Sequence, residues 1–158
     1  MASTISATVT ATTPEPRDEL FARFIPVQLP DILTGWGPVP AVAATSGQTG
    51  PWDTPGSTRT VHLSDGSTAR ERVTDCRTPA YFAYVVAEFT NPVRHLATEA
   101  HGQWWFDQDG DANTTHIRWT YSFTARSPAA ALALQPVVAL AWRRFMRVGL
   151  DRLVAQRR

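Results

Sequence analysis

Apolar and polar residues alternate along most of residues 58–124, whereas residues 127–158 have the spacing of a helix. The alternation is clearest in the last of the β-type segments, whose inward face would carry Ile117, Trp119, Tyr121 and Phe123. A sheet with one apolar face needs a cover, and one long helix can supply it. The pattern predicts an α+β fold in which a curved antiparallel sheet of six to seven strands wraps around a long C-terminal helix.

Two short helices are expected after the first strand. Residues 5–12 alternate with a period of two, and Thr13 is expected to cap a helix whose first residue is Pro14. One or two further helical turns are expected within residues 30–37, before a strand at residues 41–47. In the C-terminal segment, Pro136 is expected either to start the long helix or to kink it.

Composition excludes several classes of function. All 15 basic residues are Arg, so the chain has no lysine for a Schiff base or a phosphate-binding P-loop. A net charge of +1 without a basic stripe argues against a nucleic-acid partner. Cys76 is the only cysteine, which excludes an intramolecular disulfide and a cysteine-based zinc site. The 4 histidines never occur at ligand spacing on one helix, so we expect no metal and no cofactor.

Length and hydropathy describe an ordinary globular protein. Hydrophobic residues make up 43% of the chain, and residues 1–158 are expected to form one domain. The N-terminal residues lack the basic and apolar regions of a signal peptide. No apolar run approaches the about 20 residues that a membrane span needs. We therefore expect a cytoplasmic protein without a membrane span, for which a homodimer is compatible with the sequence.

The turn at residues 64–66 admits two strand registers. A two-residue loop would place Val61 opposite Arg70, pairing an apolar residue with a charged one. A three-residue loop, with Gly66 in the left-handed conformation, would instead pair Val61 with Ala69. We favour the second register, because it keeps apolar residues together and puts glycine where a positive φ is needed.

The favoured register makes Arg59 and Glu71 direct neighbours on the inward face of the sheet. A buried ion pair is costly to desolvate, and an apolar pair of similar size is often as stable. Two interpretations are open. In one, the pair is structural and closes one end of the barrel. In the other, Arg59 stabilises a carbonyl or enolate oxygen of a ligand, and Glu71 acts as a base or orients the ligand.

Strand alternation also predicts an aromatic interior. The predicted lining consists of Phe82, Tyr84, Trp104, Phe106, Trp119, Tyr121 and Phe123 from the sheet and Trp142, Phe145 and Met146 from the helix. These residues either fill a solid core or surround a cavity for a flat, apolar ligand, with Tyr84 and Tyr121 as hydrogen-bond donors. Glu88 is expected near the end of the same inward face. Trp105 is expected on the outer face, near His116 and Arg118.

Two loops resemble a phosphate-binding loop and a calcium-binding loop, but neither has the residues that such a site requires. The glycine-rich loop at residues 45–57 lacks the Gly-Lys-Ser/Thr end of a phosphate loop and leads into a strand, not a helix. It is expected to be either a mobile loop at the cavity mouth, with Trp52 as a lid and Asp53 at its tip, or a plain hairpin loop with Trp52 docked on the surface. In residues 107–113 the glycine stands at the wrong step for a calcium loop, and Arg118 occupies the position of the bidentate glutamate, so a hairpin turn is expected.

Local motifs add a resemblance to a known superfamily. The segments GQTGPWDTPGSTRTV, LSDGSTARERV, PAYFAYVV, GQWWF and IRWTYSF, with the predicted order of elements, resemble the SRPBCC or START-like helix-grip superfamily. That group includes START lipid-transfer domains, the birch-pollen allergen and bacterial polyketide cyclases/dehydrases. The likeness is to the actinobacterial cyclase/dehydrase-type branch and extends from Ile5 to about Gln156. It implies a helix-grip fold with an internal cavity, and cyclases of this group are similar in placing an Arg inside it.

Three functions are compatible with these observations. The favoured one is a cofactor-free cyclase or dehydratase that binds a small hydrophobic, aromatic or polyketide-like molecule. The second is a carrier or sensor that binds a hydrophobic ligand or lipid in the same pocket without catalysis. The third is an interaction module that uses the outer face around Trp105 and Arg118.

Overall fold

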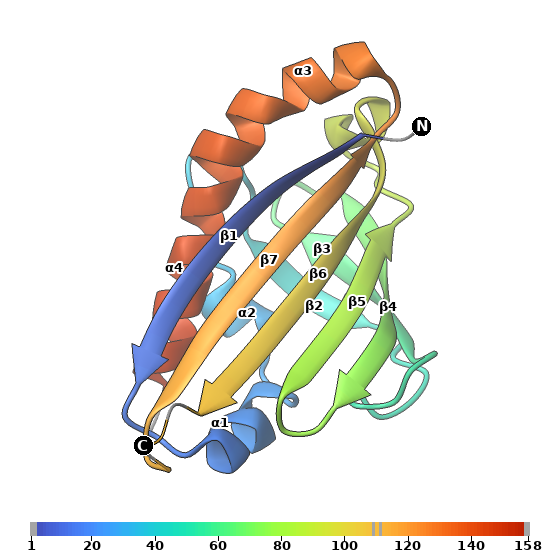
Figure 1. Cartoon of the computed structure of the whole chain (residues 1–158). Coiled ribbons are helices and arrows are strands. Elements are labelled where there is room, and N and C mark those ends of the chain that lie inside the picture. Colours follow the sequence, from blue (N-terminus) through green and yellow to red (C-terminus); the bar gives the residue numbers. More distant parts are fainter. Residues whose placement is uncertain (1–2, 109, 111, 157–158) are drawn as a thin grey trace.

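The computed structural model describes residues 3–108, 110 and 112–156. Within these residues, one antiparallel sheet has the strand order β1-β7-β6-β5-β4-β3-β2 (Figure 1). Its strands are β1 Thr4–Thr13, β2 Val42–Ser46, β3 Thr58–Leu63, β4 Thr68–Arg77, β5 Tyr81–Ala87, β6 Ala97–Gln108 and β7 Thr115–Ala125. Strands β2 to β7 follow one another as a meander, and β1 pairs with β7 along its whole length.

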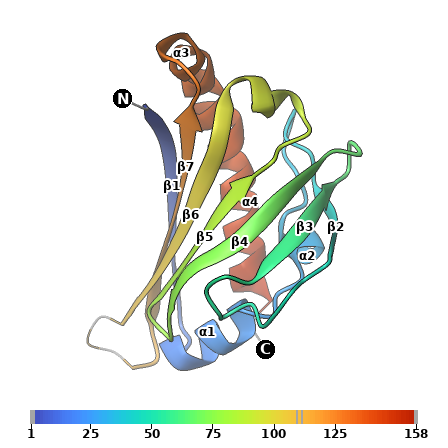
Figure 2. The ribbon, with the colours of Figure 1, turned by 90° about the vertical axis from the view of Figure 1, so that its right-hand side faces the viewer.

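Helices occupy one side of this sheet. They are α1 Arg17–Phe24, α2 Leu29–Ile32, the 3₁₀ turn η1 Pro92–His95, α3 Pro128–Pro136, the π-type segment η2 Val137–Trp142 and α4 Arg143–Ala155. Figure 2 shows α4 lying in the bend of the sheet, with β1 and β7 on one side and β2 and β3 on the other. The structure therefore confirms the predicted α+β helix-grip arrangement. None of its described helices combines the length and apolarity needed to span a membrane.

The first helix begins later than the sequence predicts. Thr13 is the last residue of β1, and α1 starts at Arg17 after an extended Pro16 that provides no side-chain cap. The Thr13 hydroxyl instead donates to the Glu15 carboxylate at 3.4 Å. The helix does not start at Pro14, because Glu15 precedes Pro16 and a residue before proline disfavours helical backbone angles. The capping role expected of Thr13 is therefore wrong.

The C-terminal helix is continuous but irregular at Pro136. Proline has no N–H for the helical hydrogen bond to residue 132, and its ring crowds that turn. The six residues after it, Val137–Trp142, have wider π-type turns before regular helix resumes at Arg143. The alternative in which Pro136 starts the helix is thus excluded. Within this segment Val137 and Leu140 are exposed, whereas Val138 and Ala141 are buried.

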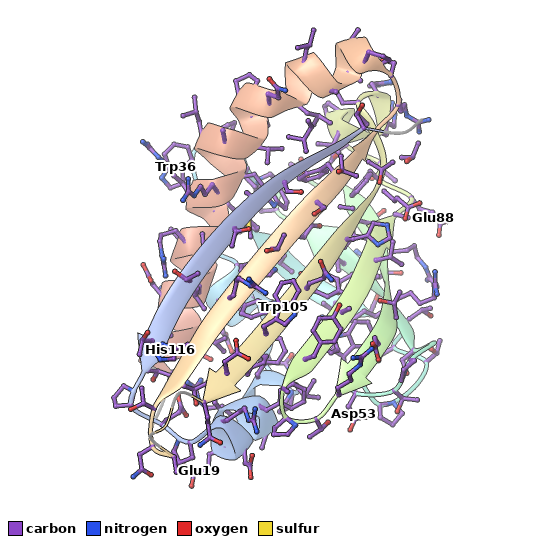
Figure 3. The ribbon with its side chains drawn as sticks, in the orientation of Figure 1. Glu19, Trp36, Asp53, Glu88, Trp105 and His116 are labelled. Carbon is purple, nitrogen blue, oxygen red and sulfur yellow. The ribbon has the colours of Figure 1, made fainter. Side chains whose placement is uncertain are left out.

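The β3–β4 hairpin has the predicted three-residue register. Val61 pairs with Ala69 and Arg59 with Glu71, and Gly66 has a φ of 86°. On the neighbouring strand, the face alternation fails at one position. Glu88 is exposed instead of pointing inward, because β5 ends at Ala87 and the backbone turns with a φ of 55° at Glu88 (Figure 3).

The inner face of the sheet and the helices form an aromatic core. Trp104 stacks on Trp119 with ring centroids 4.4 Å apart, and Phe24 of α1 packs at 4.7 Å from Trp104. Trp105 lies on the outer face, where the Arg118 guanidinium sits 4.2 Å from its ring centroid (Figure 3). The predicted division of β6 and β7 into an inner and an outer face is confirmed.

Candidate functional site

A buried ion pair lies on the inner face of β3 and β4. The two strands pair Arg59 with Glu71, and Arg59 Nε donates to Glu71 Oε1 at 2.8 Å. The residues are 7% and 8% exposed, so the pair has left bulk water. The indole ring of Trp52 stacks on the guanidinium, with Arg59 Cζ 3.9 Å from the ring centroid. Arg59 is therefore held between a carboxylate and an aromatic face.

A cavity of about 330 Å³ separates the sheet from the C-terminal helix. Its walls are mostly aliphatic and aromatic, and the predicted site residues among them are Glu71, Tyr84, Trp119, Tyr121, Phe123, Trp142 and Phe145. The lining residues that are exposed, Pro38, Asp65, Pro92 and Val137, place the mouth between the loop Pro38 to Pro40, the β3–β4 turn, the connection from Phe89 to Val93 and the start of η2. This volume and lining fit a small, mainly apolar molecule.

A second cavity of about 50 Å³ lies beside the first, toward α1. The predicted site residues that line it are Trp52, Arg59, Glu71, Phe82, Tyr84, Trp104 and Trp119. Tyr84 and Trp119 line both cavities. Glu71 likewise contributes to the walls of both cavities, whereas Arg59 contributes only to the small one.

The glycine-rich loop has neither of the two places expected for it. Trp52 is 8% exposed and lines the small cavity, so it is not docked on the surface. No described residue of this loop lines the large cavity or its mouth. Asp53 is exposed near the ends of β4 and β5 that lie farthest from α3 (Figure 3). Trp52 thus covers the Arg59 guanidinium beside the small cavity.

Two tyrosines present phenol groups to the large cavity. Tyr84 and Tyr121 are 8% and 6% exposed and lie edge to face, with centroids 6.4 Å apart. Burial raises the pKa of Tyr84, and the nearby Glu71 carboxylate adds to the shift. Burial also raises the pKa of Tyr121 well above its usual value. Both phenols therefore stay protonated at neutral pH and can donate hydrogen bonds.

Two tryptophans that line the large cavity have an indole N–H without a hydrogen bond in the part of the chain that the structure describes. Trp119 Nε1 and Trp142 Nε1 are buried without a hydrogen-bond partner among the described residues. The Trp119 indole lies close enough to the Tyr84 phenol to offset part of its raised pKa, but the contact lacks hydrogen-bond geometry. The buried Trp119 N–H therefore has no hydrogen-bond partner among the described residues.

Two predicted lining residues lie in the packed core. Phe106 is fully buried and packs edge to face on Phe21 of α1, with centroids 5.3 Å apart. Met146 is also fully buried within the main core cluster. Neither residue lines either cavity. Their inward direction is as the alternation predicts, but α1 fills the space in front of Phe106.

Several lining residues carry no sequence signal for a site. They come from α2 and the connections around the mouth, and include Leu29, Leu33, Pro38, Val39, Phe89 and Val93. Strand alternation cannot identify them, because they lie outside strands. Their closeness to the sheet depends on how the connections fold back, and only a cluster of apolar residues in loops could have suggested it.

Metal-binding side chains do not gather in the part of the chain that the structure describes. No group of three or more His, Cys, Asp or Glu side chains is close enough to hold an ion. In the turn proposed from residues 107–113, Asp109 and Asp111 lie outside the described residues. Cys76 is half-buried, and burial raises the pKa of its thiol, which makes it a poor nucleophile.

Three solved structures with this fold show the range of similar proteins. A truncated norcoclaurine synthase from Thalictrum flavum is 11% identical, with a TM-score of 0.73 and coverage of 97% of this chain and 92% of that one. The Zhui aromatase/cyclase from Streptomyces sp. R1128 is 17% identical, with a TM-score of 0.70 and coverage of 98% and 93%. An uncharacterised protein from Bacillus thuringiensis is 16% identical, with a TM-score of 0.62 and coverage of 95% and 96%.

At these identities the structural likeness establishes the fold and not the activity. No curated protein matches the sequence. The family model described as "Polyketide cyclase / dehydrase and lipid transport" matches residues 4–157, which is nearly the whole chain. The protein therefore belongs to the polyketide cyclase/dehydrase and lipid transport family.

Proposed function

We propose that the protein binds a small, flat, mainly apolar molecule in the large cavity and promotes its cyclisation or dehydration without a cofactor. The observation that carries the proposal is the placement of Glu71, a buried carboxylate paired with Arg59, on the wall of an otherwise apolar cavity of about 330 Å³. The family, and the fold shared with an aromatase/cyclase and a norcoclaurine synthase, support this class of ligand and reaction.

The proposed chemistry is an intramolecular aldol condensation. The Glu71 carboxylate takes a proton from the carbon next to a ligand carbonyl, and the resulting enolate carbon attacks a second carbonyl to form a carbon–carbon bond. The oxygen of that second carbonyl receives a proton and later leaves as water, together with a proton from the adjacent carbon. The Tyr84 and Tyr121 phenols donate hydrogen bonds to the developing oxyanion, and Arg59 holds the Glu71 side chain in place.

Binding can be tested with fluorenone, a flat aromatic ketone, by isothermal titration calorimetry. Ala69→Phe and Val86→Phe each add a ring to the cavity wall and should weaken fluorenone binding about tenfold or more. Trp105→Phe, on the outer face, is the matched control and should leave the affinity unchanged. Failure of the native protein to bind fluorenone or its apolar analogue fluorene would remove the proposed ligand class.

Catalysis can be tested with ortho-diacetylbenzene, which condenses with loss of water to a methylindenone. The native protein should accelerate this reaction, and Glu71→Gln should reduce the acceleration about a hundredfold while fluorenone still binds. Arg59→Lys keeps the positive charge but loses the planar guanidinium, and should retain part of the rate. An unchanged rate in Glu71→Gln would exclude Glu71 as the base.

A carrier of a hydrophobic ligand is the second candidate, and one observation favours it. Arg59 is already engaged by Glu71 and Trp52 and does not line the large cavity. A ligand could therefore fill the cavity without meeting the guanidinium. Tight fluorenone binding with no acceleration of the diacetylbenzene reaction would favour the carrier over the enzyme.

A further inference from the structure

The large aliphatic side chains that the described surface leaves exposed all belong to one helical segment. Leu132 is 69% exposed, Val137 42% and Leu140 61%. They lie on the outer side of α3 and η2, where Leu134 and Val138 provide the buried side. Single exposed apolar residues are common, but a cluster on one element marks an interaction surface.

The charges carried by this part of the chain are all positive. Between Ala112 and Leu150 the sequence contains no Asp or Glu, and Arg143 and Arg144 lie three and four residues after Leu140. Both arginines are exposed. The Arg144 guanidinium lies 5.0 Å from the ring centroid of Trp36, which projects beside the helix (Figure 3). An apolar face with flanking Arg and Trp is the composition of helices that lie in a membrane interface.

The same segment borders the mouth of the large cavity. Val137 is part of the cavity lining as well as of the exposed surface. The loop that carries Trp36 and Pro38 packs on Ala141 and Phe145 of the helix, and Pro38 lines the cavity mouth. We call the surface formed by Trp36, Leu132, Val137, Leu140, Arg143 and Arg144 the mouth patch. It connects the apolar interior with the outside of the molecule.

We propose that the mouth patch docks on an anionic lipid bilayer, so that an apolar ligand passes between the membrane and the cavity without crossing water. A second copy of the chain fits less well, because a two-fold contact would bring Arg143 and Arg144 of both copies together and cover the mouth. A bilayer with anionic headgroups instead neutralises these arginines and accepts the leucine side chains. The proposal holds whether or not the cavity is catalytic.

The test is flotation of the whole protein with vesicles of phosphatidylcholine alone or mixed with phosphatidylglycerol. The native protein should float with the mixed vesicles, much less with the neutral ones, and less as NaCl is raised. Leu132→Ser with Leu140→Ser, and separately Arg143→Ser with Arg144→Ser, should each weaken binding about tenfold or more. Trp105→Ser on the outer face is the control and should bind as the native protein does.

The substituted side chains are exposed, and circular dichroism of each variant checks that the fold is retained. Absence of flotation, equal binding to neutral vesicles, or undiminished binding of the leucine variant would each overturn the proposal. Analytical ultracentrifugation tests the alternative, in which the mouth patch contacts a second copy of the chain instead of a bilayer. A dimer that the leucine substitutions dissociate would assign the mouth patch to a second copy of the chain.

Discussion

Gly102 on β6 leaves the space that the Tyr84 ring occupies. A Cβ atom at position 102 would lie 2.1 Å from Tyr84 Cζ, far inside van der Waals contact. The two residues pair across β5 and β6, so the ring lies flat over the glycine instead of standing away from the sheet. The absence of one side chain thus sets the direction of a phenol that faces the large cavity.

Gly102→Ala should therefore push the Tyr84 ring into the cavity. We expect a loss of about 1–3 kcal/mol in the free energy of unfolding, measured by urea denaturation, together with weaker fluorenone binding. In a Tyr84→Ala background Gly102→Ala should reduce the free energy of unfolding much less, because the ring that the new Cβ would meet is absent. Equal costs in both backgrounds would show that the ring does not occupy this space.

The two buried phenols should make the folded protein less stable as the pH rises through the alkaline range. Burial raises the pKa of Tyr84 and of Tyr121, so the folded protein holds these protons at pH values where the unfolded chain loses them. The stability is fully present below the unfolded pKa of about 10 and falls as the pH rises above it toward the folded pKa values. Urea denaturation across this range should show the decline. Tyr84→Phe and Tyr121→Phe should each flatten it, and a decline unchanged in both variants would contradict the assignment.

Among the elements, the β3–β4 hairpin decides what the interior contains. Its three-residue loop sets the register that pairs Arg59 with Glu71 on the inner face. A shift by one residue would place Val61 opposite Arg70, so that Arg59 and Glu71 would lie on opposite faces of the sheet. The turn is fixed by Gly66 in the left-handed region and by Asp65, whose side chain accepts hydrogen bonds from Ser67 that lower its pKa.

Gly66→Ala should cost about 1 kcal/mol of unfolding free energy, because a residue with a Cβ is strained at this φ. No atom lies within 4 Å of the position that the Cβ would take, so the cost comes from the backbone alone. Gly66→Asn should cost less, since asparagine tolerates the left-handed region better. Urea denaturation of the two variants checks the order, and an alanine variant as stable as the native protein would show that the turn relaxes.

At the level of the whole molecule, the long helix does not fill the bend of the sheet. At one end, α1 packs against Phe106, and Ile117 is almost fully buried, whereas the other end retains the large cavity. The wider turns of η2 and Pro136 fall at this open end (Figure 1). A protein with such a void gains stability when a ligand fills it.

Fluorenone at about a hundred times its Kd should stabilise the folded state by about 2.7 kcal/mol. For a chain of this size the corresponding rise in Tm is about 5–10 °C, which differential scanning calorimetry can measure. Ala69→Phe, which narrows the cavity, should show little or no rise. A rise of the same size in both proteins would place the ligand outside the cavity.

The sequence by itself determined the order of elements, the strand faces and the Arg59–Glu71 register. These follow from local rules: alternation assigns each strand residue to a face, and glycine permits the turn at Gly66. The sequence-based prediction was wrong at two residues. Thr13 does not cap α1, because the helix starts only after Pro16, and Glu88 does not point inward, because its positive φ ends the strand alternation.

Only the tertiary structure decided which inward residues line the cavities. Phe106 and Met146 point inward as predicted yet lie in solid packing, and Trp52 lines the small cavity and not the large one. The mouth itself comes from loop residues such as Pro38 and Phe89, far apart in sequence. The physical reason is that burial direction is a property of one strand, whereas empty space depends on how far the facing helix and loops approach it.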